Sequence, residues 1–433
     1  MRAGSFVLAF ALLASVTNVL PSRATNEAVS QGALAHGGAY LVERDPGVAE
    51  AAVELWFRAP SDGYDASTPG IAQLAAVAVA AVPLAAGRSL VDFLQAVGGR
   101  FSVNVYPDMV AVSATVPASA ARRTIATMTA AYFAPTVSDD SLKTAQQDAA
   151  VLGIERKYSA ALALHDLAFQ QLFAGGPAHQ SPLPESDAQI TAVSRGAVDA
   201  FAKRAFRASN ALLAVAGNVE ASAIDAVTDG TLGTMDSPYD SPLASSPQDI
   251  SQNGSVDGIG LAWAGPPIVD EKAATAMDFI NDYLFRDDSG TLQRTLDAAG
   301  SSTALSGQFV TLHDPGVMIV TISGPNADAT RTGVLAAIAS LNRPMDAATF
   351  AAAQQAFVYH CLSDAQTPQA AADNLGWYGT EGNAAYAPGI PDGTYVRDAL
   401  ALDPDYVAGI ARTYLKAPVV VRLVTATAKG SAS

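Results

Sequence analysis

Short runs of β-branched, aromatic and alternating apolar residues predict strands in both halves of the chain. In the first half they cover residues 39–42, 51–57, 101–106, 109–116 and 212–217. In the second half they cover residues 258–263, 309–312, 317–323 and 419–425. An Asp-Pro-Gly sequence at residues 45–47 separates the first two runs. Such punctuation between β-rich runs favours a hairpin-like connection.

Longer segments with apolar residues at helical spacing predict helices between these strands. The first-half segments are residues 70–82, 89–97, 119–133, 138–173 and 199–206. The second-half segments are residues 271–285, 290–298, 328–341 and 347–363. Ser119 and Ser138 begin two of these helices and are able to cap them.

The two halves repeat the same order of elements. Residues 201–204 (FAKR) and 410–413 (IART) lie 209 positions apart, and each segment precedes a strand. A period of this length indicates a duplicated domain. Alternating strands and helices predict an α+β fold of two tandem homologous domains, each a mainly antiparallel sheet with helices packed on one face. We place the domains at residues 25–227 and 255–433, joined by a Ser/Pro/Asp-rich linker at 228–254.

Residues 1–24 have the pattern of a secretory signal. Arg2 precedes an apolar stretch at residues 6–19, and Ser22-Arg23-Ala24 fits a cleavage site. We expect a mature chain that begins near Thr25, with no stable membrane span; retention of the segment as an anchor is the alternative. The single cysteine, Cys361, excludes an intrachain disulfide. An exported chain without disulfides favours the bacterial periplasm.

Charge narrows the range of partners. The net charge is −16, and removal of Arg2 and Arg23 with the leader takes it to −18. An acidic chain repels phosphates, which argues against nucleic acid as a partner. The charge favours solubility, or basic peptides as partners.

Four local segments resemble the peptidase family of pitrilysin, insulin-degrading enzyme and mitochondrial processing peptidase, the M16 family. They are residues 54–57 (ELWF) followed by 70–72 (GIA), 98–103 (GGRFSV), 173–179 (FAGGPAH), and 208–210 (ASN) with 215–219 (VAGNV). Together they place the resemblance over roughly residues 33–428. The family pattern implies two duplicated α+β domains, in agreement with the repeat.

The zinc motif of that family is missing here. Active members carry H-x-x-E-H on the helix that follows the Gly-Leu-Ala segment, with the histidines as zinc ligands and the glutamate as general base. The corresponding positions hold Gln73, Ala76 and Val77. None of these side chains replaces a histidine ligand or the glutamate base. The resemblance therefore implies an inactive member with no zinc of its own.

Other family positions are also altered. The third zinc ligand, a glutamate, belongs near Leu152 or Gly153, and the nearby Glu155 is expected to be a solvated charge paired with Arg156 or Lys157. The family's substrate-positioning arginine and tyrosine belong near Leu296 and Thr303. Neither residue type stands there, although Arg294 is two positions away.

No alternative catalytic motif emerges from the sequence. The histidines are His36, His165, His179, His313 and His360. None pairs with another ligand residue at a metal-binding spacing such as i, i+4. His360 and Cys361 are adjacent on a predicted helix, so their side chains diverge; pairing of Cys361 with His179 is a minor alternative. Burial as a small hydrophobic residue is the main interpretation of Cys361.

The leading hypothesis is a non-catalytic subunit that forms a heterodimer with an active zinc homologue and closes a peptide-holding chamber. Phe101, Ser102, Val103 and Asn104 would bind peptide by strand addition. Zinc is expected only in the active partner, and no cofactor in this chain. One alternative is a scaffold or binding protein without a protease partner. Another is an independent enzyme that uses unrecognised residues.

Overall fold

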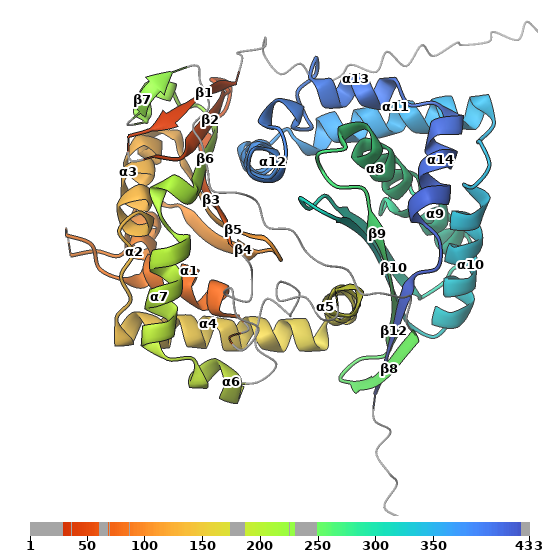
Figure 1. Cartoon of the computed structure of the whole chain (residues 1–433), viewed down its shortest axis with the longest axis horizontal. Helices are drawn as coiled ribbons and strands as arrows, with labels where there is room; N and C mark the ends of the chain where they lie inside the picture. The colour runs from red at the N-terminus through yellow and green to blue at the C-terminus, as the bar shows by residue number, and fades with distance from the viewer. Residues whose placement is uncertain are drawn as a thin grey trace, which may run out of the picture.

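The computed structural model describes residues 29–35, 37–59, 68, 70–85, 87–173, 187–224, 226–229 and 249–425. It contains two α+β halves that lie side by side (Figure 1). The predicted signal segment, His36, His179 and most of the predicted linker lie outside the described residues.

The N-terminal half forms one sheet with the strand order β4-β5-β3-β6-β2-β1-β7. Its strands are β1 (Ser30–Leu34), β2 (Ala39–Arg44), β3 (Glu50–Arg58), β4 (Arg100–Val105), β5 (Met109–Pro117), β6 (Ala211–Gly217) and β7 (Ala226–Asp229). Its helices are α1 (Ile71–Ala81), α2 (Leu90–Val97), α3 (Ala121–Tyr132), α4 (Asp139–Tyr158), α5 (Ala160–Leu172), α6 (Asp187–Ala192) and α7 (Arg195–Ala205).

The connection between β2 and β3 is not a hairpin, which corrects the sequence prediction. β6 lies between these two strands, parallel to β2 and antiparallel to β3. The Asp-Pro-Gly turn carries the chain past the end of β6, where the Asp45 amide donates to the Gly217 carbonyl at 2.8 Å. The Asp-Pro-Gly residues correctly predict that the chain reverses direction. They do not predict that β6, which comes from far along the sequence, lies between the two strands.

The C-terminal half repeats this arrangement in a sheet of order β10-β11-β9-β12-β8. Its strands are β8 (Asp249–Gly254), β9 (Gly258–Gly265), β10 (Ala304–Val310), β11 (Gly316–Ser323) and β12 (Val419–Thr425). Its helices are α8 (Glu271–Phe285), α9 (Thr291–Ala298), α10 (Ala327–Ser340), α11 (Ala347–Asp364), α12 (Pro368–Glu381), α13 (Thr394–Leu400) and α14 (Pro404–Tyr414).

The duplication predicted from the sequence is present in the fold. α7 and α14 have the same length and begin 209 residues apart, at Arg195 and Pro404. β8 is the counterpart of β2, since each lies parallel to the strand that follows α7 or α14, which is β6 or β12. The ends of the predicted linker are therefore strands: β7 overlaps its start, and β8 occupies its last six residues.

The helix predicted over residues 138–173 is two helices. Ser159 has an extended backbone, ends α4, and caps α5 through its side chain, which accepts from the Leu162 amide at 3.4 Å. Ser138 caps α4 as predicted, with the Ser141 amide donating to its hydroxyl. Ser119 instead lies inside a short 3₁₀ turn before α3. The break at Ser159 matters because it directs α5 away from its own half.

α5 and α12 are exchanged between the halves. α5 packs on β9, β11 and β12 of the C-terminal sheet, while α12 packs on β3 and β6 of the N-terminal sheet (Figure 1). Each half places its other helices on one face of its sheet, as predicted, and the opposite face is covered by the helix from the other half. α12 is not among the helices predicted from the sequence, although Thr367 and Pro368 form a recognisable helix start.

Alternation along β3 shows how the exchange divides the core. Val53, Leu55 and Phe57 point into the cluster that contains α1, whereas Trp56 points into the cluster that contains α12. The second cluster includes residues from both halves and therefore joins them through a continuous apolar core. Within the described residues, no helix combines the length and the apolar character that a membrane span requires.

Candidate functional site

The helix that would carry a zinc motif packs as an ordinary core helix. Gln73 is only 5% exposed and Ala76 is fully buried on α1. The Ala76 carbonyl accepts a hydrogen bond from the Tyr132 hydroxyl at 2.7 Å. Val77 is partly buried against the same core. Two hydrocarbon side chains and one amide do not fit a zinc ion, which requires imidazole, thiolate or carboxylate ligands.

The acidic residue of α4 that meets α1 is Asp148. Its Oδ2 accepts a long hydrogen bond of 3.5 Å from Gln73 Nε2. Leu152, at the expected third-ligand position, is partly buried in the apolar core. Within the described segments, no three His, Cys, Asp or Glu side chains are grouped to hold a metal ion.

Glu155 is exposed on α4, as predicted. The expected local pairing of Arg156 with Glu155 is wrong, because Arg156 binds Asp166 of α5, with a 2.8 Å bond from its Nε. This ion pair links α4 and α5 across the break at Ser159. His165 stacks on Phe169, with 5.8 Å between the ring centroids.

β4, the strand predicted to bind peptide, is the edge strand of the N-terminal sheet. It pairs with β5 and has no other neighbour among the described strands. Phe101 and Val103 lean against the core, while Ser102 and Asn104 are exposed. β10, its counterpart in the C-terminal half, is also an edge strand. Both strands therefore leave backbone groups open on one side.

The substrate-positioning pair expected from the family is not formed. Leu296 is partly buried against the C-terminal core, and Thr303 is 5% exposed. Arg294 is exposed on α9.

A cavity of about 470 Å³ lies between the two halves, lined by β4, β10, α8, α11 and α12. Trp56 and Tyr106 from the N-terminal half stack at 6.0 Å, and Trp377 of α12 meets Tyr106 edge-on at 4.7 Å. Asn104 of β4 and Gln308 of β10 both line it. The cavity is on the Trp56 side of the sheet, opposite to the α1 side.

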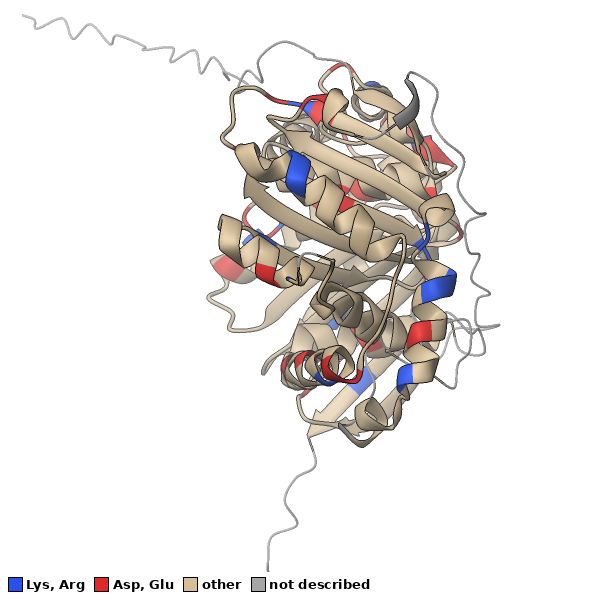
Figure 2. Cartoon of the chain, turned by 90° about the vertical axis from the view of Figure 1, so that its left-hand side faces the viewer, with Lys and Arg blue, Asp and Glu red and all other residues tan. Residues whose placement is uncertain are grey.

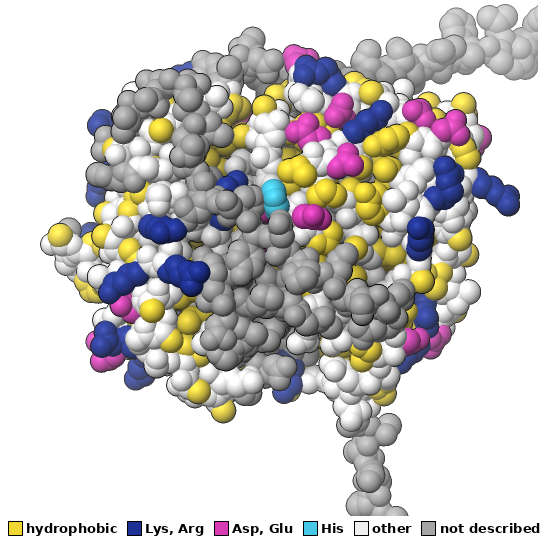
Figure 3. Space-filling model, in the orientation of Figure 1, with side chains coloured by type: hydrophobic (Ala, Val, Ile, Leu, Met, Phe, Trp, Pro, Cys, Tyr) yellow, Lys and Arg dark blue, Asp and Glu magenta, His cyan; other side chains and the backbone are white. Residues whose placement is uncertain are grey.

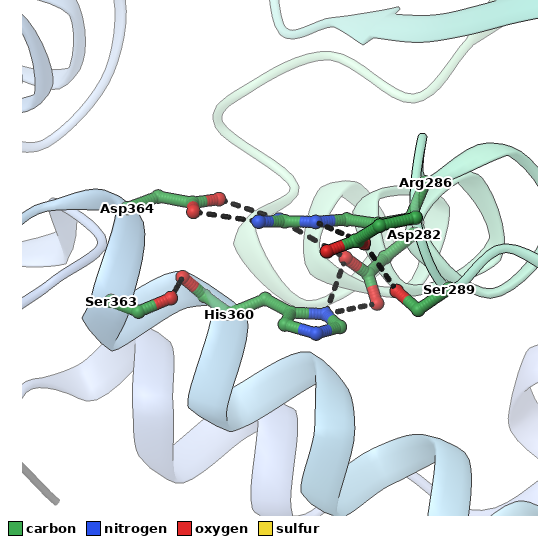
Figure 4. A network of polar contacts seen from close by, with 7 residues as sticks. Asp282, Arg286, Ser289, His360, Ser363 and Asp364 are labelled. Atoms are coloured by element: carbon green, nitrogen blue, oxygen red, sulfur yellow. Dashed lines mark hydrogen bonds and ion pairs between the residues drawn. The ribbon is translucent and has the colours of Figure 1, made fainter.

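Acidic residues of α8 and their partners form the other wall of the cavity (Figure 4). His360 Nδ1 lies 2.9 Å from Asp282 Oδ2. Arg286 lies between two carboxylates: it binds Asp364 through two bonds of 2.6 and 2.7 Å and approaches Asp282 at 3.5 Å. Figure 3 shows acidic side chains next to hydrophobic ones on one face of the C-terminal half.

Burial raises the pKa of two side chains in this wall. Asp278 accepts from the Tyr395 hydroxyl at 2.8 Å, yet burial raises the pKa of Asp278 to about 7. Burial likewise raises the pKa of the Cys361 thiol well above its usual range. Cys361 is therefore a neutral thiol and a poor nucleophile, in agreement with its interpretation as a small hydrophobic residue.

Carboxyl groups from the two halves also meet next to this cavity. Glu54 of β3 accepts from Trp56 Nε1 at 2.8 Å and from the Gln369 amide of α12. Burial first, and the neighbouring charge of Asp373 second, raise the pKa of Glu54 well above its usual range. Burial also raises the pKa of Asp373. The pair favours a shared proton over two charges.

Comparisons of the sequence and the structure with known proteins identify similar proteins. Residues 192–357, which run from the end of the N-terminal half into α11, match the family model described as Peptidase M16 inactive domain. Over this segment the chain is similar to the M16 peptidase family. The M16 resemblance seen in the sequence is confirmed. No curated protein sequence matches the chain.

Several solved structures resemble this chain over most of its length. A Helicobacter pylori protease superposes with a TM-score of 0.77 at 15% identity, covering 92% of this chain and 100% of that one. A peptidase M16 inactive domain from Pseudomonas fluorescens gives 0.73 at 16%, covering 92% and 99%. A chain of complex III2 from Candida albicans gives 0.70 at 12%, covering 91% and 95%. At such identities the likeness shows the α+β fold alone, and that fold prediction is confirmed.

The cavity between the halves was not foreseeable from the sequence. Asp282 and His360 are 78 residues apart, and Glu54 and Gln369 are 315 apart. No spacing rule connects residues at such separations. The one local signal was an unusual density of acidic residues on α8, at Asp278 and Asp282, which are i, i+4 and so share one helix face.

Proposed function

We propose that this M16-like chain is a non-catalytic subunit that pairs with an active zinc-bearing homologue and helps to enclose peptides. The observation that carries the proposal is the packing of Gln73, Ala76 and Val77 into an intact core. The fold is retained while the chemistry of the motif is gone, which favours a role in assembly or binding.

The edge strand β4 supports a contribution to peptide binding. Its exposed residues Ser102 and Asn104 lie beside an unpaired sheet edge, to which an extended peptide is able to add as a further strand. Export to the periplasm is part of the same proposal and rests on the sequence of residues 1–24.

The test is co-expression with the product of a neighbouring gene that encodes H-x-x-E-H in the same fold. We expect the two chains to co-elute in size-exclusion chromatography, with zinc stoichiometric to the partner alone. Peptide cleavage should require both chains. A neighbour that cleaves at full rate alone and never co-elutes with this chain would reject the proposal.

A scaffold without protease activity is the second candidate. It is favoured by the fold likeness to a chain of complex III2, which covers 91% of this chain. Affinity purification of the full chain from its native cell separates the candidates. Recovery in an assembly without any H-x-x-E-H chain would favour the scaffold.

A further inference from the structure

The cavity between the halves is distinct from the position of the altered zinc motif. It opens on the face of the N-terminal sheet that α12 covers, whereas α1 packs on the other face. Its volume of about 470 Å³ is sufficient for a small organic molecule.

Three of the donors that line this cavity are already used within the protein. Trp377 Nε1 donates to the Thr311 carbonyl at 2.8 Å. The Tyr395 hydroxyl donates to Asp278, and the guanidinium of Arg286 is held by Asp364. These three donors are therefore not available to a ligand.

Acceptors, in contrast, are in surplus. Asn281 Oδ1 is buried at the cavity and accepts no hydrogen bond from the described residues. Four carboxyl groups line the cavity against one guanidinium and one imidazole: Asp278, Asp282, Asp364, Asp373, Arg286 and His360. Buried acceptors without donors are costly, so a ligand that donates hydrogen bonds and carries positive charge would be stabilised here.

The aromatic residues of the cavity also favour a cation as the ligand. Tyr106 and Trp377 line the cavity in an edge-to-face pair, backed by Trp56. The faces of such rings attract cations, and their apolar surface packs against an alkyl chain. Carboxylates at one wall and indole or phenol rings at the other thus suit an elongated cation.

We propose that this cavity binds a small alkylammonium cation, with the ammonium group among Asp278, Asn281 and Asp373 and the alkyl chain against Tyr106 and Trp377. The same group is supplied by a free amine or by a lysine side chain of a bound peptide. A quaternary ammonium is disfavoured because it donates no hydrogen bonds to the acceptors.

Isothermal titration calorimetry of the full chain tests the proposal, with 1,4-diaminobutane, tetramethylammonium and butyrate as probes. We expect binding of the diamine, weaker binding of tetramethylammonium and none of butyrate. Asp278→Asn and Asp373→Asn should each weaken diamine binding by roughly tenfold or more, the loss expected for one charge-assisted hydrogen bond. Asp328→Asn is the matched control, since Asp328 is exposed and pairs with Arg422 away from the cavity.

A lysine peptide and its acetyl-lysine form distinguish the two sources of the cation. Binding of the lysine peptide but not of the diamine or the acetylated peptide would assign the cavity to a peptide side chain. Failure of all amines to bind, or equal binding by Asp278→Asn and Asp328→Asn, would overturn the proposal.

The pH dependence of diamine binding to the unmodified chain gives a second test, which needs no folded variant. The carboxyl of Asp278 faces Asp282 of its own helix, Cys361 of α11, Tyr378 of α12 and Tyr395 of α13. Diamine affinity of the unmodified chain should rise from pH 5 to pH 8 as Asp278, with a pKa of about 7, ionises while the ammonium stays charged. Affinity that does not change over this range would contradict the placement of the ammonium beside Asp278.

Discussion

Trp56 of β3 and Gly376 of α12 are in direct contact, although 320 residues separate them. A Cβ built on Gly376 would lie 1.9 Å from Trp56 Nε1. The side chain of Trp56 is itself fixed by its bond to Glu54. Glycine at position 376 is therefore what allows a helix of the C-terminal half to lie flat on the N-terminal sheet.

Gly376→Ala should destabilise the chain by about 2 kcal/mol or more, because a methyl group there must displace a buried indole. Urea unfolding followed by circular dichroism measures the change. Gly333→Ala is the control: this α10 glycine has open space around its Cβ direction and should gain roughly 0.5–1 kcal/mol from helix propensity. Equal behaviour of the two variants would show that α12 does not pack as described.

Ala76→Glu restores only the general-base position of the M16 motif. We expect it to destabilise the protein by more than about 2 kcal/mol, since the side chain would carry a carboxyl group into a fully buried site. It should not confer zinc binding or peptide cleavage, because Gln73 and Val77 remain. Ala126→Glu, on the exposed side of α3, is the matched control and should change stability little. Elemental analysis of the unmodified chain should find no stoichiometric zinc.

Asp278 should make the protein less stable as the pH rises. Its pKa is raised to about 7 in the fold, against about 4 in an unfolded chain. Between these values the folded state binds more protons than the unfolded state, so the free energy of unfolding falls with increasing pH. Asp278→Asn keeps a hydrogen-bond acceptor for Tyr395 and removes the titrating group, so the stability that Asp278 costs at higher pH is recovered. The stability of the variant relative to the unmodified chain should therefore increase from pH 4 to pH 8 in urea titrations.

Asp328→Asn should show the opposite trend. The guanidinium of Arg422 lowers the pKa of Asp328, so its contribution to stability is present above the unfolded pKa and is lost as the pH falls. A small loss of stability at neutral pH that vanishes in acid is expected. The same slope for both variants would contradict the assignment of Asp278 as a buried, neutral carboxyl.

If a peptide adds to β4 as a further strand, its affinity should depend on its backbone amide groups. A peptide that binds the chain or its heterodimer should lose affinity when alternate amides are N-methylated, because the methyl groups remove donors and obstruct the sheet edge. Methylation of the intervening amides, which would point away from β4, is the control. Fluorescence anisotropy of labelled peptides measures both. Equal loss in the two series would argue against pairing with the edge strand.

The local features of this protein follow from its sequence alone. Apolar alternation located most strands, Ser138 marked the start of α4, and the repeated segments near Phe201 and Ile410 revealed the duplication. The prediction that the zinc motif is lost rests on the identities of Gln73, Ala76 and Val77, since ligand chemistry depends on residue type rather than on packing. Figure 2 shows basic and acidic residues interspersed along the helices of the N-terminal half that face the viewer.

The way in which the two halves are joined depends on long-range packing. The insertion of β6 between β2 and β3, the turn of α5 at Ser159 and the placement of α12 on the opposite sheet all depend on contacts between residues far apart in sequence. The carboxyl pair of Glu54 and Asp373 and the cavity beside it exist only because of that exchange. Hydrophobic periodicity states which face of a helix is buried, but the surface that buries it is selected by packing across the whole chain.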